Sequence, residues 1–296
     1  MKRRPVLLGF MVLGVLLCLF VISIGVLSYL TSRDESFWGK DKVAILEIKG
    51  VILDPQPTVE KLIRFRKNEQ VKAIILRIDS PGGGVGPAQE IYAEVKKTQR
   101  EKKVLVSVGS VAASGGYYIA CAADQIMANP GSITGSIGVI MENVNVEDLL
   151  AKIGLRPNVV KSGKHKDIGS PLRSMTEEER KLLQGVLDSI HEQFIQAVAE
   201  GRKVPVEKIR PLADGRIFSG DQAKDLGLID SLGNLEDAIA MAGQLGGIKG
   251  EPEVIYPEKK RFSILDLILE ETIQKTLETF RGNASPYHFF YLMPNA

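Results

Sequence analysis

The chain has 296 residues and is 44% apolar, enough for a sizeable core in one or two domains. Its 38 Lys and Arg against 36 Asp and Glu leave a formal charge of +2, so the charge gives no reason to expect a nucleic-acid partner. The two cysteines, Cys18 and Cys121, provide neither a disulfide framework nor a CxxC metal spacing.

Residues 7–30 form an apolar run without a charge, directly after Lys2, Arg3 and Arg4. As a helix, this run spans about 36 Å, compared with a hydrocarbon core of roughly 30 Å. We expect a single-pass anchor in the cytoplasmic membrane, with residues 1–6 in the cytoplasm and the chain after residue 31 outside. A cleaved signal peptide is the alternative, although its apolar stretch is usually about 7–15 residues long.

After a polar linker at 31–41, short apolar runs of β type alternate with helical runs. This alternation predicts an α/β domain over 42–250, built on a mostly parallel sheet. Thr176 and Glu179 form a capping-box pattern at the start of the second predicted helix. The predicted strands are 42–50, 72–80, 103–110 and 124–130, and the predicted helices are 86–103 and 176–203.

Two glycine-rich turns follow predicted strands. Ser114 stands in VAASGGYYIACAAD (111–124), between a strand and a helix, a setting similar to a nucleophile elbow. The stretch IDSPGGGVG (78–86) allows main-chain N–H groups to approach a ligand closely, and its spacing does not match a nucleotide-binding motif. A tightly packed turn is the alternative for both stretches.

A serine nucleophile needs a base. The histidines are His165, His191 and His288, and Lys166 directly follows the first of them. In an extended segment, His165 and Lys166 point to opposite sides, so only one of them can face Ser114. A lysine can serve as a base where desolvation lowers its pKa from about 10.4 toward 7–8. A solvated basic loop is the alternative for this segment.

Several motifs, in order over 42–245, resemble the short bacterial form of the signal peptide peptidase A family. They are DSPGGG, GSVAASGGYYIACAADQIMANPGSITGSIGVI, KSGKHKDIGSPLRSMTEEER and DGRIFSGDQAKDLGLID. The resemblance implies the crotonase-like (Clp-type protease) ββα superhelix, an α/β fold. With the expected anchor, the fold class is that superhelix with an N-terminal transmembrane helix.

The resemblance also implies roles for individual residues. Ser114 would be the nucleophile, Lys166 the general base and Ser136 the residue that holds the lysine amine by a hydrogen bond. The N–H groups of Gly83 and Gly115 would form the oxyanion hole. No metal and no organic cofactor is implied.

The implied activity is a serine endopeptidase that hydrolyses signal peptides and other peptides left in the membrane. The resemblance implies a ring-shaped homo-oligomer in which Ser and Lys meet from neighbouring protomers, and residues 7–30 would contact lipid. A related membrane protease with a specific membrane-protein partner is the alternative. A crotonase-like acyl-CoA enzyme and an inert scaffold fit the Ser–Lys pair less well.

The C-terminal part, 251–296, comprises a linker, an amphipathic helix at about 263–280 and a tail. The helix is expected to pack on the protein or on a neighbour, with a membrane-surface role or a disordered tail as alternatives. The tail is apolar and aromatic, and a groove for extended peptides could accept it. We therefore expect residues 285–296 to occupy or border a substrate groove and to restrain activity.

Overall fold

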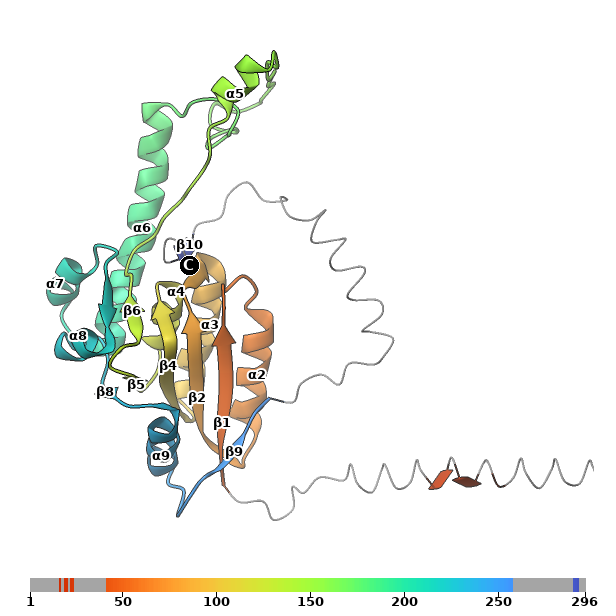
Figure 1. Ribbon diagram of the computed structural model, residues 1–296, viewed down its shortest axis with the longest axis vertical. Helices are drawn as coiled ribbons and strands as arrows, with labels where there is room; N and C mark the ends of the chain where they lie inside the picture. The colour runs from red at the N-terminus through yellow and green to blue at the C-terminus, as the bar shows by residue number, and fades with distance from the viewer. Residues whose placement is uncertain (1–15, 17–18, 21, 24–40, 258–289, 293–296) are drawn as a thin grey trace, which may run out of the picture. The chain divides into compact units, whose positions relative to one another are not determined.

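The computed structural model describes residues 16, 19–20, 22–23, 41–257 and 290–292 (Figure 1). The chain divides into two compact units, Met1–Lys40 and Asp41–Ala296. No helix within the described residues is long and apolar enough to cross a membrane. The predicted anchor at 7–30 falls mostly, and the predicted helix at 263–280 entirely, outside the described residues, so both stay predictions.

In the described part of the second unit, eight strands form a sheet with the order β7-β6-β4-β2-β1-β9, in which β5 pairs with β4 and β8 with β5. Only the β6–β7 pair is antiparallel among these strands. The four predicted strands and the mixed α/β class are confirmed. The strands are β1 (Lys42–Lys49), β2 (Val71–Ser80), β4 (Lys103–Ala113), β5 (Gln125–Ala128), β6 (Ile133–Gly135), β7 (Ile217–Ser219), β8 (Ser231–Leu232) and β9 (Glu253–Ile255).

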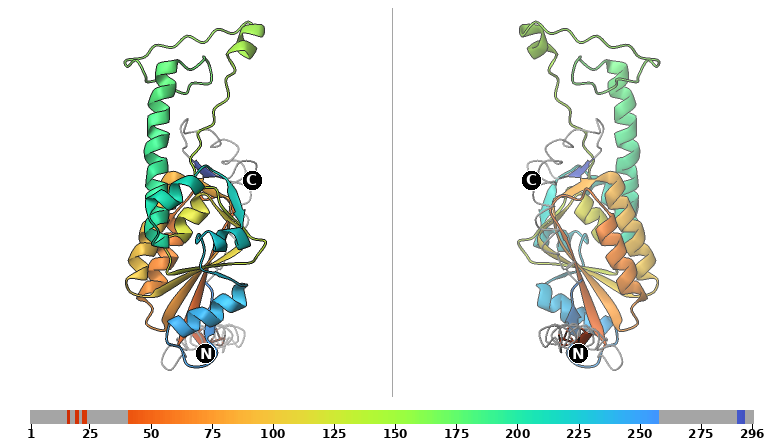
Figure 2. Two further views of the ribbon diagram at one scale, coloured as in Figure 1. Left: turned by 90° about the vertical axis from the view of Figure 1, so that its left-hand side faces the viewer. Right: turned by 90° about the vertical axis from the view of Figure 1, so that its right-hand side faces the viewer.

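Helices cover both faces of the sheet. Figures 1 and 2 show α2 (Gln56–Lys67) and α3 (Val85–Gln99) on one face and α9 (Leu235–Leu245) on the other. Along β1, Ala44 and Leu46 belong to the core on the α2 and α3 side, whereas Val43 and Ile45 belong to the core on the α9 side. Because both faces are buried, the central strands are continuous apolar runs.

The helix α6 (Glu177–Arg202) starts with the predicted capping box, in which the Glu179 N–H donates to the Thr176 side chain. Its C-terminal half packs into the core through Phe194 and Val198, whereas its N-terminal half is mostly exposed. Residues 138–176, which we call the arm, run from the end of β6 to the end of α6 remote from the sheet, where α5 (Glu147–Lys152) lies (Figures 1 and 2).

Shorter elements complete the described chain. Two of them, a three-glycine strand and a C-terminal strand, form a separate two-stranded sheet. These elements are β3 (Gly82–Gly84), α4 (Gly115–Ala120), α7 (Val206–Ile209), η2 (Arg210–Leu212), α8 (Gly220–Asp225) and β10 (Phe290–Leu292).

Candidate active site

Ser114 lies at the N-cap of α4, directly after the end of β4. Its φ of 52° and ψ of −118° lie outside the regions that non-glycine residues ordinarily adopt. The residue is 1% exposed, and its Oγ has no hydrogen-bond partner within the described part of the chain. Main-chain strain and an unpaired buried hydroxyl each cost about 1–3 kcal/mol. Their coincidence in one residue makes Ser114 a candidate functional residue.

The main chain around Ser114 is held from both sides. The Ser114 N–H donates to the Gly135 carbonyl at 2.9 Å, and the Tyr118 N–H donates to the Ser114 carbonyl at 2.8 Å. The second bond is the first hydrogen bond of α4. The N–H of Gly115 lies before it and therefore has no acceptor within the helix. Gly115 therefore has a main-chain donor next to the candidate nucleophile, as the motif predicts.

A bulge in β4 bends the strand shortly before Ser114 and so affects the orientation of this residue. The pairing of β2 with β4 shifts register at Asp79. The Asp79 Oδ1 accepts the main-chain N–H groups of Ser110 and Val111 at 3.1 and 3.2 Å. Because a bulge bends its strand and re-aims the residues that follow, Asp79 positions Ser114. The sequence motifs include Asp79, but only the fold reveals this contact.

The strand β3 presents Gly83 to the site. The Ile52 N–H donates to the Gly82 carbonyl at 2.9 Å, and the Gly84 N–H donates to the Ile52 carbonyl at 2.8 Å. Since main-chain groups alternate between the two edges of a strand, the N–H of Gly83 points away from Ile52. A Cβ at Gly83 would lie 2.1 Å from the Ile52 carbonyl oxygen, so only glycine fits there. The strand contacts α4, the helix that begins at Gly115 directly after the candidate nucleophile Ser114.

The second edge of β3 pairs antiparallel with β10, which also contacts α4. Tyr291 is the partner of Gly83 in this pairing. Part of the predicted tail thus lies as an extended strand across the edge that carries the Gly83 N–H. An extended peptide that binds by strand addition would use the same edge.

Deletion of residues 285–296 is expected to raise kcat/KM for a short peptide, because it frees the edge of β3. The measurement compares kcat and KM of the truncated and full-length chains at the same oligomeric state. A lower KM with unchanged kcat is the expected sign of competition by the tail. Unchanged values of both constants would leave β10 as ordinary packing.

Ser136 directly follows β6, whose last residue Gly135 accepts the Ser114 N–H. It is 5% exposed, and its φ of 50° makes it a second non-glycine residue with positive φ near the nucleophile. Its N–H donates to the Arg216 carbonyl at 2.8 Å. The predicted lysine-positioning residue therefore lies next to the predicted nucleophile.

Lys166 lies in the arm and is exposed. The preceding His165 lies with its Nε2 3.5 Å from a carboxylate oxygen of Glu178, in the first turn of α6. That turn is about 22 Å along the helix from Phe194, where α6 enters the core. Within one copy of the chain, the structure gathers Ser114 with Gly83, Gly115 and Ser136, but it does not bring Lys166 to them.

Arg173 holds the Lys166 segment on α6. Its guanidinium donates to Asp167 at 2.8 and 2.9 Å and to Glu179 at 2.8 and 2.5 Å. These bonds hold the pKa of the Asp167 carboxyl well below its usual range and lower the pKa of Glu179 to about 2. Because Asp167 follows Lys166 directly, the clamp fixes the main chain beside the candidate base.

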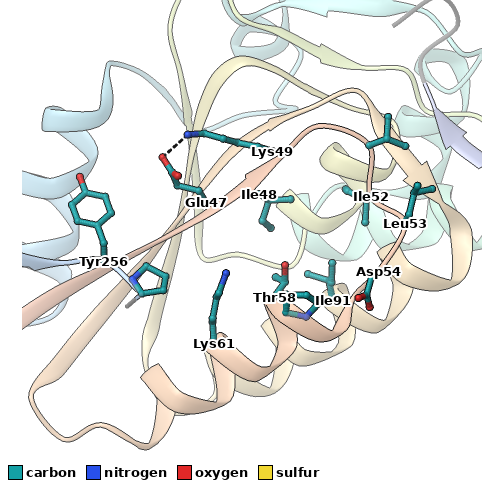
Figure 3. Close-up of a pocket in the computed structure, with 13 residues that line it drawn as sticks. Glu47, Ile48, Lys49, Ile52, Leu53, Asp54, Thr58, Lys61, Ile91 and Tyr256 are labelled. Carbon is teal, nitrogen blue, oxygen red and sulfur yellow. Dashed lines mark hydrogen bonds and ion pairs between the residues drawn. The ribbon is translucent and has the colours of Figure 1, made fainter. Parts of the chain in front are cut away.

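A pocket of about 840 Å³ opens between β1 and α2, with Tyr256 at one end (Figure 3). Glu47 and Lys49, which line it from β1, form an ion pair at 2.7 Å. None of the predicted site residues lines this pocket. Its link to the site is Ile52, whose main chain pairs with β3.

Two protein-family models match the chain. The model described as Peptidase family S49 matches residues 96–249, and the model described as Clp protease matches residues 54–133. Ser114 lies within both matches, and Lys166 lies within the first.

Relatives from bacteria, archaea and plants align with most of the chain. A protein of Synechocystis sp. assigned as a protease is 45% identical over 210 residues, 71% of this chain and 76% of that protein. A protein of Methanocaldococcus jannaschii with the same assignment is 33% identical over 263 residues, 81% of this chain and 84% of that protein. The chloroplastic serine protease SPPA of Arabidopsis thaliana is 34% identical over 237 residues, 75% of this chain and 35% of that protein.

Proposed function

Because the chain belongs to peptidase family S49, we propose that it is a serine endopeptidase in which Ser114 is the nucleophile and Lys166 of a neighbouring copy is the general base. The family relation agrees with the resemblance to signal peptide peptidase A found in the motifs. The observation that carries the proposal is the buried Ser114 Oγ, which has no partner within the described residues and sits on a strained turn. A nucleophile whose general base comes from another copy of the chain is expected to have this unpaired hydroxyl within a single copy.

The exposed arm supports a base that arrives from a second copy. Single exposed apolar residues are common, but a contiguous set of them marks an interaction surface. Lys166 shares the arm with several exposed apolar side chains, so association that buries them would carry the lysine to another protomer. The exposed apolar side chains of the arm include Val144, Leu149, Ile153, Leu155, Val159 and Val160.

In the proposed reaction, an extended peptide pairs with the β3 edge. The neutral amine of Lys166 takes the proton of Ser114 as the Oγ attacks the peptide carbonyl carbon, while Ser136 holds the amine. The N–H groups of Gly83 and Gly115 stabilise the tetrahedral oxyanion. The C–N bond then breaks, and the lysine ammonium returns its proton to the leaving amine. Water, deprotonated by the same lysine, hydrolyses the acyl-serine ester.

We further propose that residues 7–30 anchor the protein in the cytoplasmic membrane, with the peptidase domain on the outer side. The apolar run and the three preceding basic residues support this orientation. The substrates are then peptides retained in the membrane, chiefly cleaved signal peptides, because apolar peptides concentrate where the anchor holds the enzyme. The ring-shaped homo-oligomer implied by the resemblance provides the neighbouring Lys166.

A fluorophosphonate probe is expected to label the full-length chain at Ser114 and to leave Ser114→Ala unlabelled. Ser231→Ala is the matched control, since the Ser231 Oγ also lacks a partner within the described residues but lies on β8. Mass spectrometry of the products from signal peptides in vesicles then tests the substrate class. Labelling without cleavage of any membrane peptide would favour a protease for a specific membrane-protein partner, and an unlabelled wild-type chain would contradict a serine enzyme.

A further inference from the structure

We propose that Ser80 is a positioning residue for the oxyanion hole, whose hydroxyl holds β3 so that the Gly83 N–H faces Ser114. The inference rests on the proposed function, because it assigns a role within that site. Ser80 is the last residue of β2 and is fully buried. The proposed reaction does not use its hydroxyl, so the burial of this polar group has another cause.

The Ser80 hydroxyl joins two main-chain segments. It donates to the Gly50 carbonyl at 2.7 Å and accepts the Gly82 N–H at 3.1 Å. Gly50 directly follows β1, and Gly82 is the first residue of β3. One side chain therefore holds the segment after β1 beside the start of the three-glycine strand.

The segment after β1 and the strand β3 are also joined by main-chain hydrogen bonds at Ile52, two residues after Gly50. There, the main chain of Ile52 bonds to Gly82 and Gly84 and leaves the Gly83 N–H on the opposite edge, the one that pairs with β10. The strand β3 has no side chains of its own to pack, so its bonds to Ile52, its pairing with β10 and the Ser80 bond determine where it lies. Loss of the Ser80 bond would let the start of β3 shift and would turn the Gly83 N–H.

On its other side, Ser80 touches the helix that supplies the second donor. A Cβ at Gly116 would lie 2.9 Å from the Ser80 carbonyl oxygen, so α4 packs directly on this residue. Ser80 thus contacts both β3, with Gly83, and α4, with Gly115. Oxyanion donors act only when each lies about 2.7–3.1 Å from the developing charge. The main chain of Ser80 packs against α4, and its hydroxyl holds β3 at a fixed place beside that helix.

Ser80→Ala is expected to lower kcat by roughly ten- to a hundred-fold while KM changes by less than about two-fold, because the oxyanion forms only in the transition state. Affinity for an extended peptide aldehyde should weaken by a similar factor. In the aldehyde adduct, the Ser114 Oγ bonds to the aldehyde carbon and the hydroxyl proton passes to the former carbonyl oxygen, which occupies the oxyanion position. Affinity for the matching peptide alcohol should not change.

Ser107→Ala is the matched control, because Ser107 is also buried and accepts a hydrogen bond from Arg77 at 2.8 Å, but on the central part of β4. It should leave kcat, KM and aldehyde affinity within about two-fold of wild type. If Ser80→Ala does not yield a folded protein, Ser80→Cys, which replaces the hydroxyl by a somewhat larger thiol that forms weaker hydrogen bonds, carries the same measurements.

A folded Ser80 variant with normal kcat and normal aldehyde affinity would overturn the inference, even if its melting temperature fell. A rise in KM with unchanged kcat would also overturn it, since that result would mean that Ser80 supports substrate binding and not transition-state stabilisation. Failure of the proposed function looks different, because Ser114→Ala would then hydrolyse the peptide at the wild-type rate.

Discussion

Ser114→Ala and Lys166→Ala are each expected to lower kcat for peptide hydrolysis by roughly 10⁴-fold or more, whereas His165→Ala should keep most of the activity. Loss of either member of a nucleophile–base pair removes nearly all catalysis, since the two groups act as a unit. His165 lies 3.5 Å from a carboxylate oxygen of Glu178, which ties it to the first turn of α6. The measurement is single-turnover hydrolysis of a fluorogenic peptide by each purified variant.

Lys164→Ala is the matched control for the charge change, because Lys164 is exposed, pairs with Glu178 and lies two residues before the candidate base. Its activity should remain close to wild type. Near-normal cleavage by Lys166→Ala together with an inactive His165→Ala would reverse the assignment of the base.

Assemblies that contain both Ser114→Ala and Lys166→Ala subunits are expected to recover activity that neither variant has alone. In a ring where each site takes its serine from one protomer and its lysine from the next, random one-to-one mixing leaves about a quarter of the sites intact. Co-expression with two affinity tags, followed by purification on both, isolates mixed assemblies for the assay.

Assemblies of Ser114→Ala with the Ser114→Ala/Lys166→Ala double variant are the control and should stay inactive, because no protomer then provides a nucleophile. Absence of recovery in mixed assemblies that carry both tags would mean that each subunit holds its own pair. The position of Lys166, on an arm about 22 Å along α6 from the core, leads us to expect recovery.

The sequence alone determined the elements whose signals are local. The apolar runs at 42–50, 72–80 and 103–110 became β1, β2 and β4, because strands covered by helices on both faces need apolar side chains throughout. The start of α6 followed from Thr176 and Glu179, which bond to each other across one helical turn. The strand–turn–helix around Ser114 followed from neighbouring residues in the same way.

The short elements of the site could not be predicted from local signals. A run of three glycines has no strand propensity, and β3 exists because Ile52 pairs with one edge and β10 with the other. Asp79 and Ser80 belong to the glycine-rich stretch 78–86, but their side chains bond to main-chain groups of other segments. Sequence spacing does not reveal such partners.

Only the tertiary structure decided how the candidate base lies with respect to the nucleophile. The sequence predicts the helix at 176–203, but it does not say that this helix carries the Lys166 segment away from the core. The sequence by itself determined which residues have the chemistry and which runs form strands and helices, because these depend on side-chain type and near neighbours. The placement of Gly83, the role of Ser80 and the exposure of the arm depend on contacts between distant segments, which only the folded chain brings together.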